Sequence, residues 1–207
     1  MQRQTFLIFL FFLLLPNKIY AGLAGSPHDF SNKTWSAGEI CLPCHNAHIE
    51  VIQDDDVPLL NRPVRTTSYR VYSSPTFDGD IGQPGGVSRL CLSCHDGFSA
   101  IDRFDGGNGS VFISGDARLG NAPGDHHPIS FIYDTALAQE DGDLHDPATA
   151  ASGLGGTIAE DLLKNGRVEC TSCHDVHNRH DFLRFIDAGG GVAGLCQTCH
   201  VSGPPGG

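Results

Sequence analysis

Long apolar stretches are scarce in this chain, and the longest lies close to its start. Residues 6–15 (FLIFLFFLLL) are all hydrophobic; Arg3 precedes them, and a stretch containing Ala21 and Ala24 follows. A membrane-spanning helix needs about 20 apolar residues, roughly twice this number. A basic start, a short apolar run and small residues at a cleavage site are typical of a secretory signal. We therefore expect residues 1–21 to be a signal peptide and residues 22–207 to be one mature domain.

After residue 21 the hydrophobic positions form only short groups, which turn-forming residues interrupt. The chain has 26 glycines and 12 prolines, and these residues end regular elements. The clearest helical segment is 158–164 (IAEDLLK), which ends at Asn165-Gly166. Strand-like segments occur at 69–72, 111–114 and 129–133. The pattern predicts a fold of mostly coil and loop, with short helices and minimal β structure.

The charge of the chain is acidic. The formal net charge is −11, and it falls to −13 when Arg3 and Lys18 leave with the signal peptide. An acidic surface disfavours nucleic acid as a partner, because the phosphate backbone is bound by basic side chains. The mature chain keeps only Lys33 and Lys164 as lysines, which also disfavours an anionic membrane surface.

The eight cysteines form four CxxC pairs, and a histidine follows each pair directly. They are site I (Cys41, Cys44, His45), site II (Cys91, Cys94, His95), site III (Cys170, Cys173, His174) and site IV (Cys196, Cys199, His200). With 11 histidines in 207 residues, chance places a histidine after a given pair about 5% of the time. Disulfides and zinc ribbons use paired cysteines, but neither needs the adjacent histidine.

A CxxCH motif is the attachment site of a c-type haem. The spacing lets one turn of chain present two sulfur atoms to the porphyrin edge, and the following imidazole can bind the iron. The sequence therefore predicts four covalently bound haems c, with His45, His95, His174 and His200 as proximal iron ligands. This assignment uses every cysteine.

Seven histidines remain for the sixth iron positions, and the only methionine, Met1, lies in the predicted signal peptide. We expect each iron to have two histidine ligands, which gives electron-transfer sites rather than open catalytic ones. The predicted distal ligands are His28, His48, His127 and His177. Two alternatives stay open: His126 for His127, and His180 for His177. His145 is expected at the surface.

His48 follows His45 by three residues, and His177 follows His174 in the same way. Neither can reach the far face of its own haem, because the porphyrin plane lies between, so each must serve a different haem. The repeated spacing divides the chain into two loosely similar halves, about 22–120 and 121–207. A chain with so few apolar runs depends on its haems for a core, so we expect the apoprotein to be unfolded.

Several segments together resemble a known family. "SPHDFS", "CLPCHNAH", "SRLCLSCHDGFSA", "DHHPISFIY", "VECTSCHDVHN" and "LCQTCH" are similar to those of the doubled-CXXCH multihaem cytochromes c, and most to the OmcE-type tetrahaem cytochromes, which polymerise into extracellular filaments. The resemblance implies four stacked haems, a head-to-tail homopolymer, and His48 bound to a haem of the adjacent subunit, with haem IV as the expected one. The doubled His126-His127 departs from the single histidine of the family.

This resemblance implies a secreted electron-transfer protein, not an enzyme, that passes electrons to redox partner cytochromes and external acceptors. Two alternatives remain: a monomeric periplasmic electron shuttle, and a multihaem reductase with one open haem.

Overall fold

The computed structural model describes residues 22–45, 62–66, 68–177 and 192–202. Its helices are η1 (Thr34–Ser36), α1 (Gly86–His95), η2 (Gly115–Ala117), η3 (Pro123–Asp125), α2 (Thr135–Asp141), α3 (Ile158–Asp161), α4 (Cys170–Cys173) and α5 (Val192–Cys199). Strands β1 (Phe131–Ile132) and β2 (Arg167–Val168) form one antiparallel pair, in which Phe131 faces Val168. The prediction of mostly coil with short helices and little β structure is confirmed for these residues. The predicted signal peptide lies outside them.

Each CxxCH motif forms a helical turn, as expected. Sites II, III and IV end helices α1, α4 and α5. Site I forms a single turn, in which the backbone N–H of His45 donates to the Cys41 carbonyl at 2.8 Å. Such a turn brings both sulfur atoms of a motif to one side of the chain.

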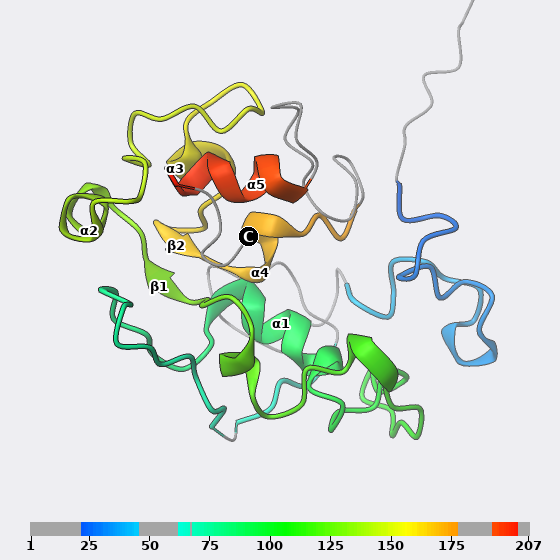
Figure 1. Cartoon of the computed structure of the whole chain (residues 1–207). Helices are drawn as coiled ribbons and strands as arrows, with labels where there is room; N and C mark the ends of the chain where they lie inside the picture. The colour runs from blue at the N-terminus through cyan, green and yellow to red at the C-terminus, as the bar shows by residue number, and fades with distance from the viewer. Residues whose placement is uncertain (1–21, 46–61, 67, 178–191, 203–207) are drawn as a thin grey trace, which may run out of the picture.

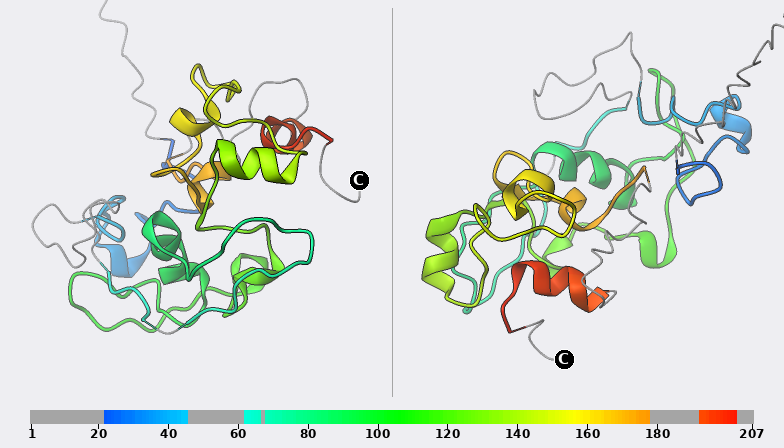
Figure 2. Two further views of the ribbon diagram at one scale, coloured as in Figure 1. Left: turned by 90° about the vertical axis from the view of Figure 1, so that its left-hand side faces the viewer. Right: turned by 90° about the horizontal axis from the view of Figure 1, so that it is seen from above.

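The three helices that carry sites II, III and IV lie one after another in space. Figure 1 shows α1 below α4 and α4 below α5, and the two views of Figure 2 keep α4 between the others. Helices α1 and α4 contact each other directly, although 74 residues separate the end of one from the start of the other. Tertiary folding thus places site III between sites II and IV.

The predicted helix at 158–164 is shorter in the structure. Helix α3 begins at a capping box formed by Thr157 and Glu160 and ends at Asp161. Lys164 already pairs with Arg167 across a tight turn, and Asn165 and Gly166 at the centre of this turn both have positive φ. The chain has left the helix before Leu163 and reverses between Lys164 and Arg167, so a further helical turn cannot form.

Two of the three predicted strands are wrong, and the third is shorter than expected. Segment 69–72 is extended, but the Gln83 side chain occupies the place of a partner strand: it accepts from the Tyr69 N–H at 2.6 Å and donates to the Tyr69 carbonyl at 3.0 Å. Segment 111–114 is also outside any strand. Of segment 129–133 only Phe131 and Ile132 belong to β1, because Ser130 has a φ of 62° and interrupts the extended backbone.

Helix α2 was not predicted, although its ends carry recognisable signals. The Asp134 side chain accepts from the backbone N–H of Leu137 at 2.9 Å, which is an N-cap. Gly142 ends the helix with φ 74°, which is a glycine C-cap.

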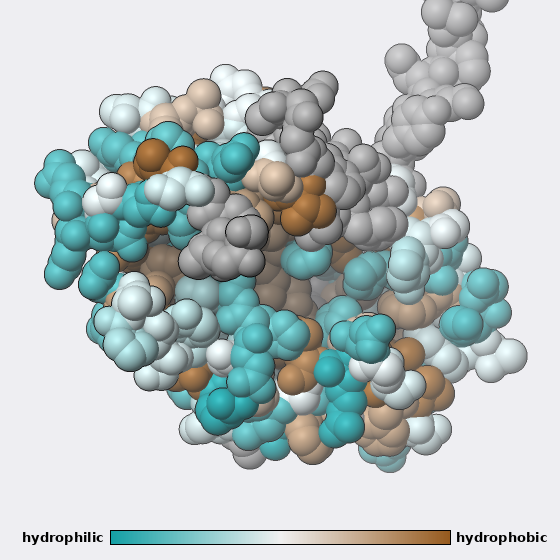
Figure 3. Space-filling model, viewed as in Figure 1, coloured by the Kyte–Doolittle hydropathy of each residue, from teal (hydrophilic) through white to brown (hydrophobic). Residues whose placement is uncertain are grey.

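The hydrophobic core lies in the second half of the chain. It is a cluster of Phe131, Tyr133, Leu137, Ala138, Ile158, Leu162, Val168 and Leu195. Cys173 of site III and Cys199 of site IV pack against it. Elsewhere apolar residues are scattered, and Figure 3 shows them as separate patches among hydrophilic residues. Among the residues that the structure describes, no helix is long and apolar enough to cross a membrane.

Candidate functional site

The structure brings proximal and predicted distal histidines together in pairs. At site II, the ring centroids of His28 and His95 are 6.0 Å apart, with their planes inclined by 52°. Turns hold His28 in place: its backbone N–H donates to Ser26 Oγ at 3.1 Å, and the Ser26 N–H donates to the Leu23 carbonyl at 3.0 Å. Burial, followed by the neighbouring His95 and His174, lowers the pKa of His28. A lowered pKa favours the neutral imidazole, which is the form that binds iron.

A second pair joins the two CxxCHxxH motifs. The ring centroids of His45 in site I and His177 are 6.2 Å apart, and the planes are nearly parallel at 19°. His177 follows site III in the chain but faces the proximal histidine of site I. His180, the alternative to His177, lies outside the described residues, as does His48.

The third pair is at site IV. The ring centroids of His127 and His200 are 6.3 Å apart, with planes at 78°. Nδ1 of His127 is 2.8 Å from the carbonyl oxygen of Pro128. A carbonyl accepts from a protonated Nδ1, which leaves Nε2 as the free electron pair for a metal. His127 and the neighbouring His126 are both exposed, but His126 faces no proximal histidine in the described part of the chain.

These pairs fit a haem iron between each two rings. Two imidazoles on opposite sides of one metal, with metal–nitrogen bonds of about 2 Å, have centroids about 6 Å apart. His95 shows the same support as His127, since its Nδ1 is 2.8 Å from the Ala117 carbonyl oxygen. Among the described residues, no three side chains of the Cys, His, Asp and Glu type form a direct metal-ion site. The recurring unit is a histidine pair beside a CxxC turn.

The cysteine side chains of successive sites lie next to one another. Burial raises the pKa of Cys94 to about 11, and the nearby Cys44 thiol also raises it. A hydrogen bond from Cys91 to Cys170 raises the pKa of the first thiol and lowers that of the second. Burial raises the pKa of Cys199 to about 12, with a smaller contribution from Cys173. Site I therefore adjoins site II, site II adjoins site III, and site III adjoins site IV.

A buried carboxyl group connects sites II and III. Glu169, which is 3% exposed, accepts hydrogen bonds from Ser88 of α1 and from Ser130, the latter at 2.9 Å. Ser88 Oγ also accepts from the Cys170 N–H at 2.9 Å. Burial raises the pKa of Glu169, although its hydrogen bonds oppose the shift. The sequence offered no signal for this role, because a glutamate before a cysteine pair reads as an ordinary surface residue.

Tyr133 holds the chain around site IV. Its hydroxyl donates to the His145 carbonyl at 2.5 Å, and the His145 N–H donates to the Cys199 carbonyl at 2.8 Å. His145 was expected at the surface and is half-buried. In the described part of the chain its ring faces no proximal histidine.

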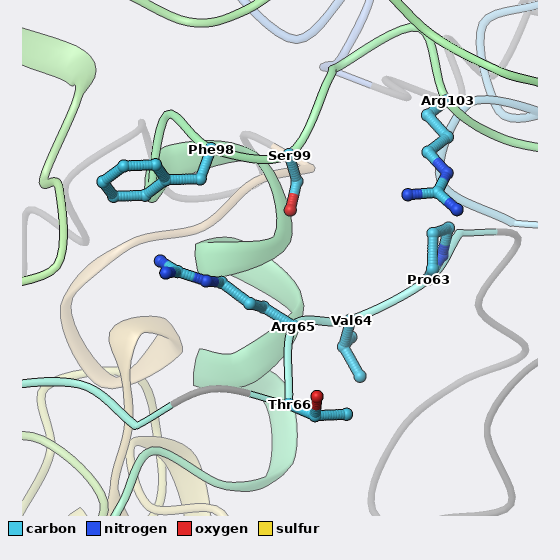
Figure 4. Close-up of a pocket in the computed structure, with 7 residues that line it drawn as sticks. All are labelled: Pro63, Val64, Arg65, Thr66, Phe98, Ser99 and Arg103. Atoms are coloured by element: carbon cyan, nitrogen blue, oxygen red, sulfur yellow. The ribbon is translucent and has the colours of Figure 1, made fainter.

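Arg65 and Arg103 line a cavity of about 380 Å³ together with Pro63, Phe98 and Ser99. Figure 4 shows Arg65 extended toward Phe98, and its guanidinium carbon lies 4.4 Å from that ring centroid. No cysteine or histidine lines this cavity. Arg70 is exposed and pairs with Asp125 at 2.6 Å.

Comparison with known protein families finds a match to the segment that contains sites III and IV. Residues 163–204 match the family model of the doubled CXXCH motif. No curated protein sequence matches the chain. The matched segment contains sites III and IV and the intervening His177. The doubled motif, together with the two CxxCH sites that precede it, supports the assignment of this chain to the multihaem c-type cytochromes, whose general role is electron transfer.

Proposed function

We propose that this protein is a tetrahaem electron-transfer cytochrome in which every haem iron is bound by two histidines. The observation that carries the proposal is the repeated pairing of His95 with His28, His45 with His177, and His200 with His127, at 6.0 to 6.3 Å between ring centroids. A haem c, when bound, supplies a one-electron Fe(III)/Fe(II) couple. A haem iron held by such a histidine pair would have both of its ligand positions filled by protein, which would keep oxygen species and substrates away from it.

The order of the attachment sites supports transfer along a row. The thiols adjoin as site I to II, II to III and III to IV, so neighbouring porphyrin edges are held near one another. Electron tunnelling weakens exponentially with edge-to-edge distance. Short steps between consecutive sites are therefore the arrangement that a conduit requires, whereas a single-site enzyme has no need of them.

His48 completes the ligand set in this proposal. His177, His28 and His127 are the distal histidines of sites I, II and IV. Site III then has its proximal ligand, His174, but still needs a distal one. Because His177 of the second CxxCHxxH serves site I, the reciprocal assignment gives His48 of the first motif to site III. This differs from the family resemblance, which directs His48 to haem IV of a neighbouring subunit. In the filament form, the His48 that serves site III comes from an adjacent copy.

Haem content and carbon monoxide binding test the electron-transfer proposal. We expect an intact mass that corresponds to four haems on the mature chain. The reduced protein should leave its Soret band unmoved under carbon monoxide, since no axial position is open. Fewer than four haems, or a shifted Soret band in a large fraction of the protein, would contradict the proposal and favour a reductase with an open haem.

The finer proposal is that the protein is secreted and polymerises head to tail into a conductive extracellular filament that reduces external acceptors. The predicted signal peptide and the family resemblance support it. Electron microscopy of material sheared from the producing cells should show filaments, and His48→Ala should retain four haems but remain monomeric. A wild-type monomer with four six-coordinate haems would instead identify a periplasmic shuttle in which His48 acts within its own chain.

A further inference from the structure

A buried hydroxyl group joins the helices that carry sites II and III. Ser88 of α1 is fully buried, and its Oγ donates to the Glu169 carboxyl group and accepts from the Cys170 N–H at 2.9 Å. Cys170 is the first residue of α4, and Ser88 lies one helical turn before Cys91 on the same face of α1. The hydroxyl is therefore bound at the first cysteine of site III and lies one turn from the first cysteine of site II.

A second hydroxyl group links the same two helices. The N–H of Gly85, the N-cap residue of α1, donates to Ser130 Oγ at 3.3 Å, and this hydroxyl donates to the Glu169 carboxyl group at 2.9 Å. Glu169 is itself the N-cap residue of α4. Ser130 is buried and has a φ of 62°, a conformation that is unfavourable for a residue with a β-carbon and persists where the surrounding structure requires it. Because α1 is held at Gly85 and at Ser88, both its distance from α4 and its direction are fixed.

Buried hydrogen bonds, rather than the hydrophobic core cluster, connect α1 to α4. Among the described residues, no member of that cluster comes from α1, although α1 and α4 contact each other and Figure 1 shows them as neighbours. Ser88, Ser130 and Glu169 are all buried, and a buried polar group that loses its partner destabilises the fold. The network therefore resists any sliding of one attachment site past the other.

We infer that Ser88 is a positioning residue for electron transfer: with Glu169 and Ser130 it fixes the separation and mutual orientation of the haems at sites II and III. The inference rests on the proposed function, because it requires haems at both sites. An electron that passes between these haems oxidises one iron by a single electron and reduces the other by the same electron. Since tunnelling weakens exponentially with distance, a rigid connection between the two helices keeps this step fast.

Soret circular dichroism of the holoprotein measures this geometry, because the exciton couplet of neighbouring haems depends on their separation and mutual angle. Ser88→Ala should lower the amplitude of the couplet relative to the wild type. Ser152→Ala is the matched control, since Ser152 is fully buried and its Oγ donates to Asp161 and accepts from the Leu154 N–H at 2.9 Å, outside the four sites. Both variants should lose thermal stability, but Ser152→Ala should keep the full couplet.

Two further variants test the rest of the network. Glu169→Gln keeps an oxygen acceptor for both serines and should retain the couplet. Ser130→Ala removes only the second link and should lower the amplitude, which keeps the test decisive if Ser88→Ala yields no folded holoprotein. A wild-type amplitude in folded Ser88→Ala or in Ser130→Ala would overturn the inference. An equal loss in Ser152→Ala, or a loss in Glu169→Gln, would do the same.

Haem content separates a failure of this inference from a failure of the proposed function. A wild-type protein with four haems and no couplet would contradict the positioning of the haems at sites II and III, while the electron-transfer proposal would stand. Fewer than four haems by mass spectrometry would mean that the proposed function itself has failed.

Discussion

His126 and His127 are adjacent in sequence but differ in their surroundings. The His127 ring faces His200, and its Nδ1 is positioned by the Pro128 carbonyl, whereas in the described part of the chain the His126 ring faces no proximal histidine. Sequence reasoning preferred His127 but left His126 open, because neighbouring residues of an extended segment point to opposite sides. This alternation means that only one of the two histidines can be the distal ligand of a given iron. It does not show which one.

His127→Ala is expected to remove the distal ligand from one of the four haem irons. About a quarter of the haem should become high-spin in the ferric spectrum, and the reduced protein should bind about one carbon monoxide per chain. His126→Ala is the matched control and should keep the wild-type spectrum. High-spin haem in the His126 variant instead would reverse the assignment of these two residues.

Glu169 gives the stability of the protein a pH dependence of known sign. Because burial raises its pKa above the ordinary value of 4.5, the folded protein keeps this proton over a pH range in which the unfolded chain releases it. Stability from this group is present below the ordinary pKa and is lost as the pH rises through the raised value. Glu169→Gln keeps an oxygen acceptor for Ser88 and Ser130 and cannot ionise.

The Glu169→Gln variant should therefore gain stability relative to the wild type as the pH rises from 4.5 through the raised pKa. Chemical unfolding of the holoprotein at a series of pH values measures this difference. Glu39→Gln makes the same charge change at an exposed position and serves as the control. A constant difference between the Glu169 variant and the wild type across the series would contradict the expected sign.

At the scale of elements, some helices could be predicted from local sequence signals, whereas other segments have a conformation that tertiary contacts decide. The helical turns at the CxxCH motifs were predicted correctly, because attachment of two sulfur atoms to one porphyrin edge requires such a turn. Segment 69–72 has strand-forming residues, yet the Gln83 side chain pairs with the Tyr69 backbone, and the Arg70 backbone pairs with Asn121 and Gly124. A side chain that replaces a neighbouring strand leaves no mark in the local sequence. The ends of α2 were readable, and its absence from the prediction reflects an overlooked cap.

The N-cap of α2 is accessible to mutation. Asp134→Ala removes the acceptor for the Leu137 N–H and should cost about 1 kcal/mol of unfolding free energy. Leu137 and Ala138 of this helix belong to the hydrophobic core, so fraying should be visible in the unfolding transition of the holoprotein. Asp116→Ala, at an exposed aspartate, should change stability little. Equal losses in both variants would mean that the cap contributes nothing specific.

At the scale of the molecule, the protein has a small core of its own. The core cluster lies between residues 131 and 195, and the region around sites I and II has no comparable group among the described residues. Ordering a backbone costs about 1 to 2 kcal/mol per residue, and this core offsets that cost for part of the chain only. Attached haems must supply apolar contacts for the remainder.

We therefore expect the chain produced without haem attachment to be largely unfolded. Circular dichroism should show mainly coil, and the amide NMR signals should have little dispersion, whereas the holoprotein should show a cooperative transition. Local order confined to the segment that contains α2, α3 and the β1–β2 pair would agree with the position of the core cluster. A cooperative, well-dispersed apoprotein would contradict the expected dependence on haem.

The sequence by itself determined the chemical class of this protein: four CxxCH motifs, a single methionine at position 1 and an acidic charge are local or compositional facts that need no fold to be read. It also limited the distal ligands to a small set of histidines. Only the tertiary structure decided that His177 faces His45 and His127 faces His200, and that the sites adjoin in chain order. These relations depend on segments far apart in sequence, and they arise when α1, α4 and the core cluster pack together.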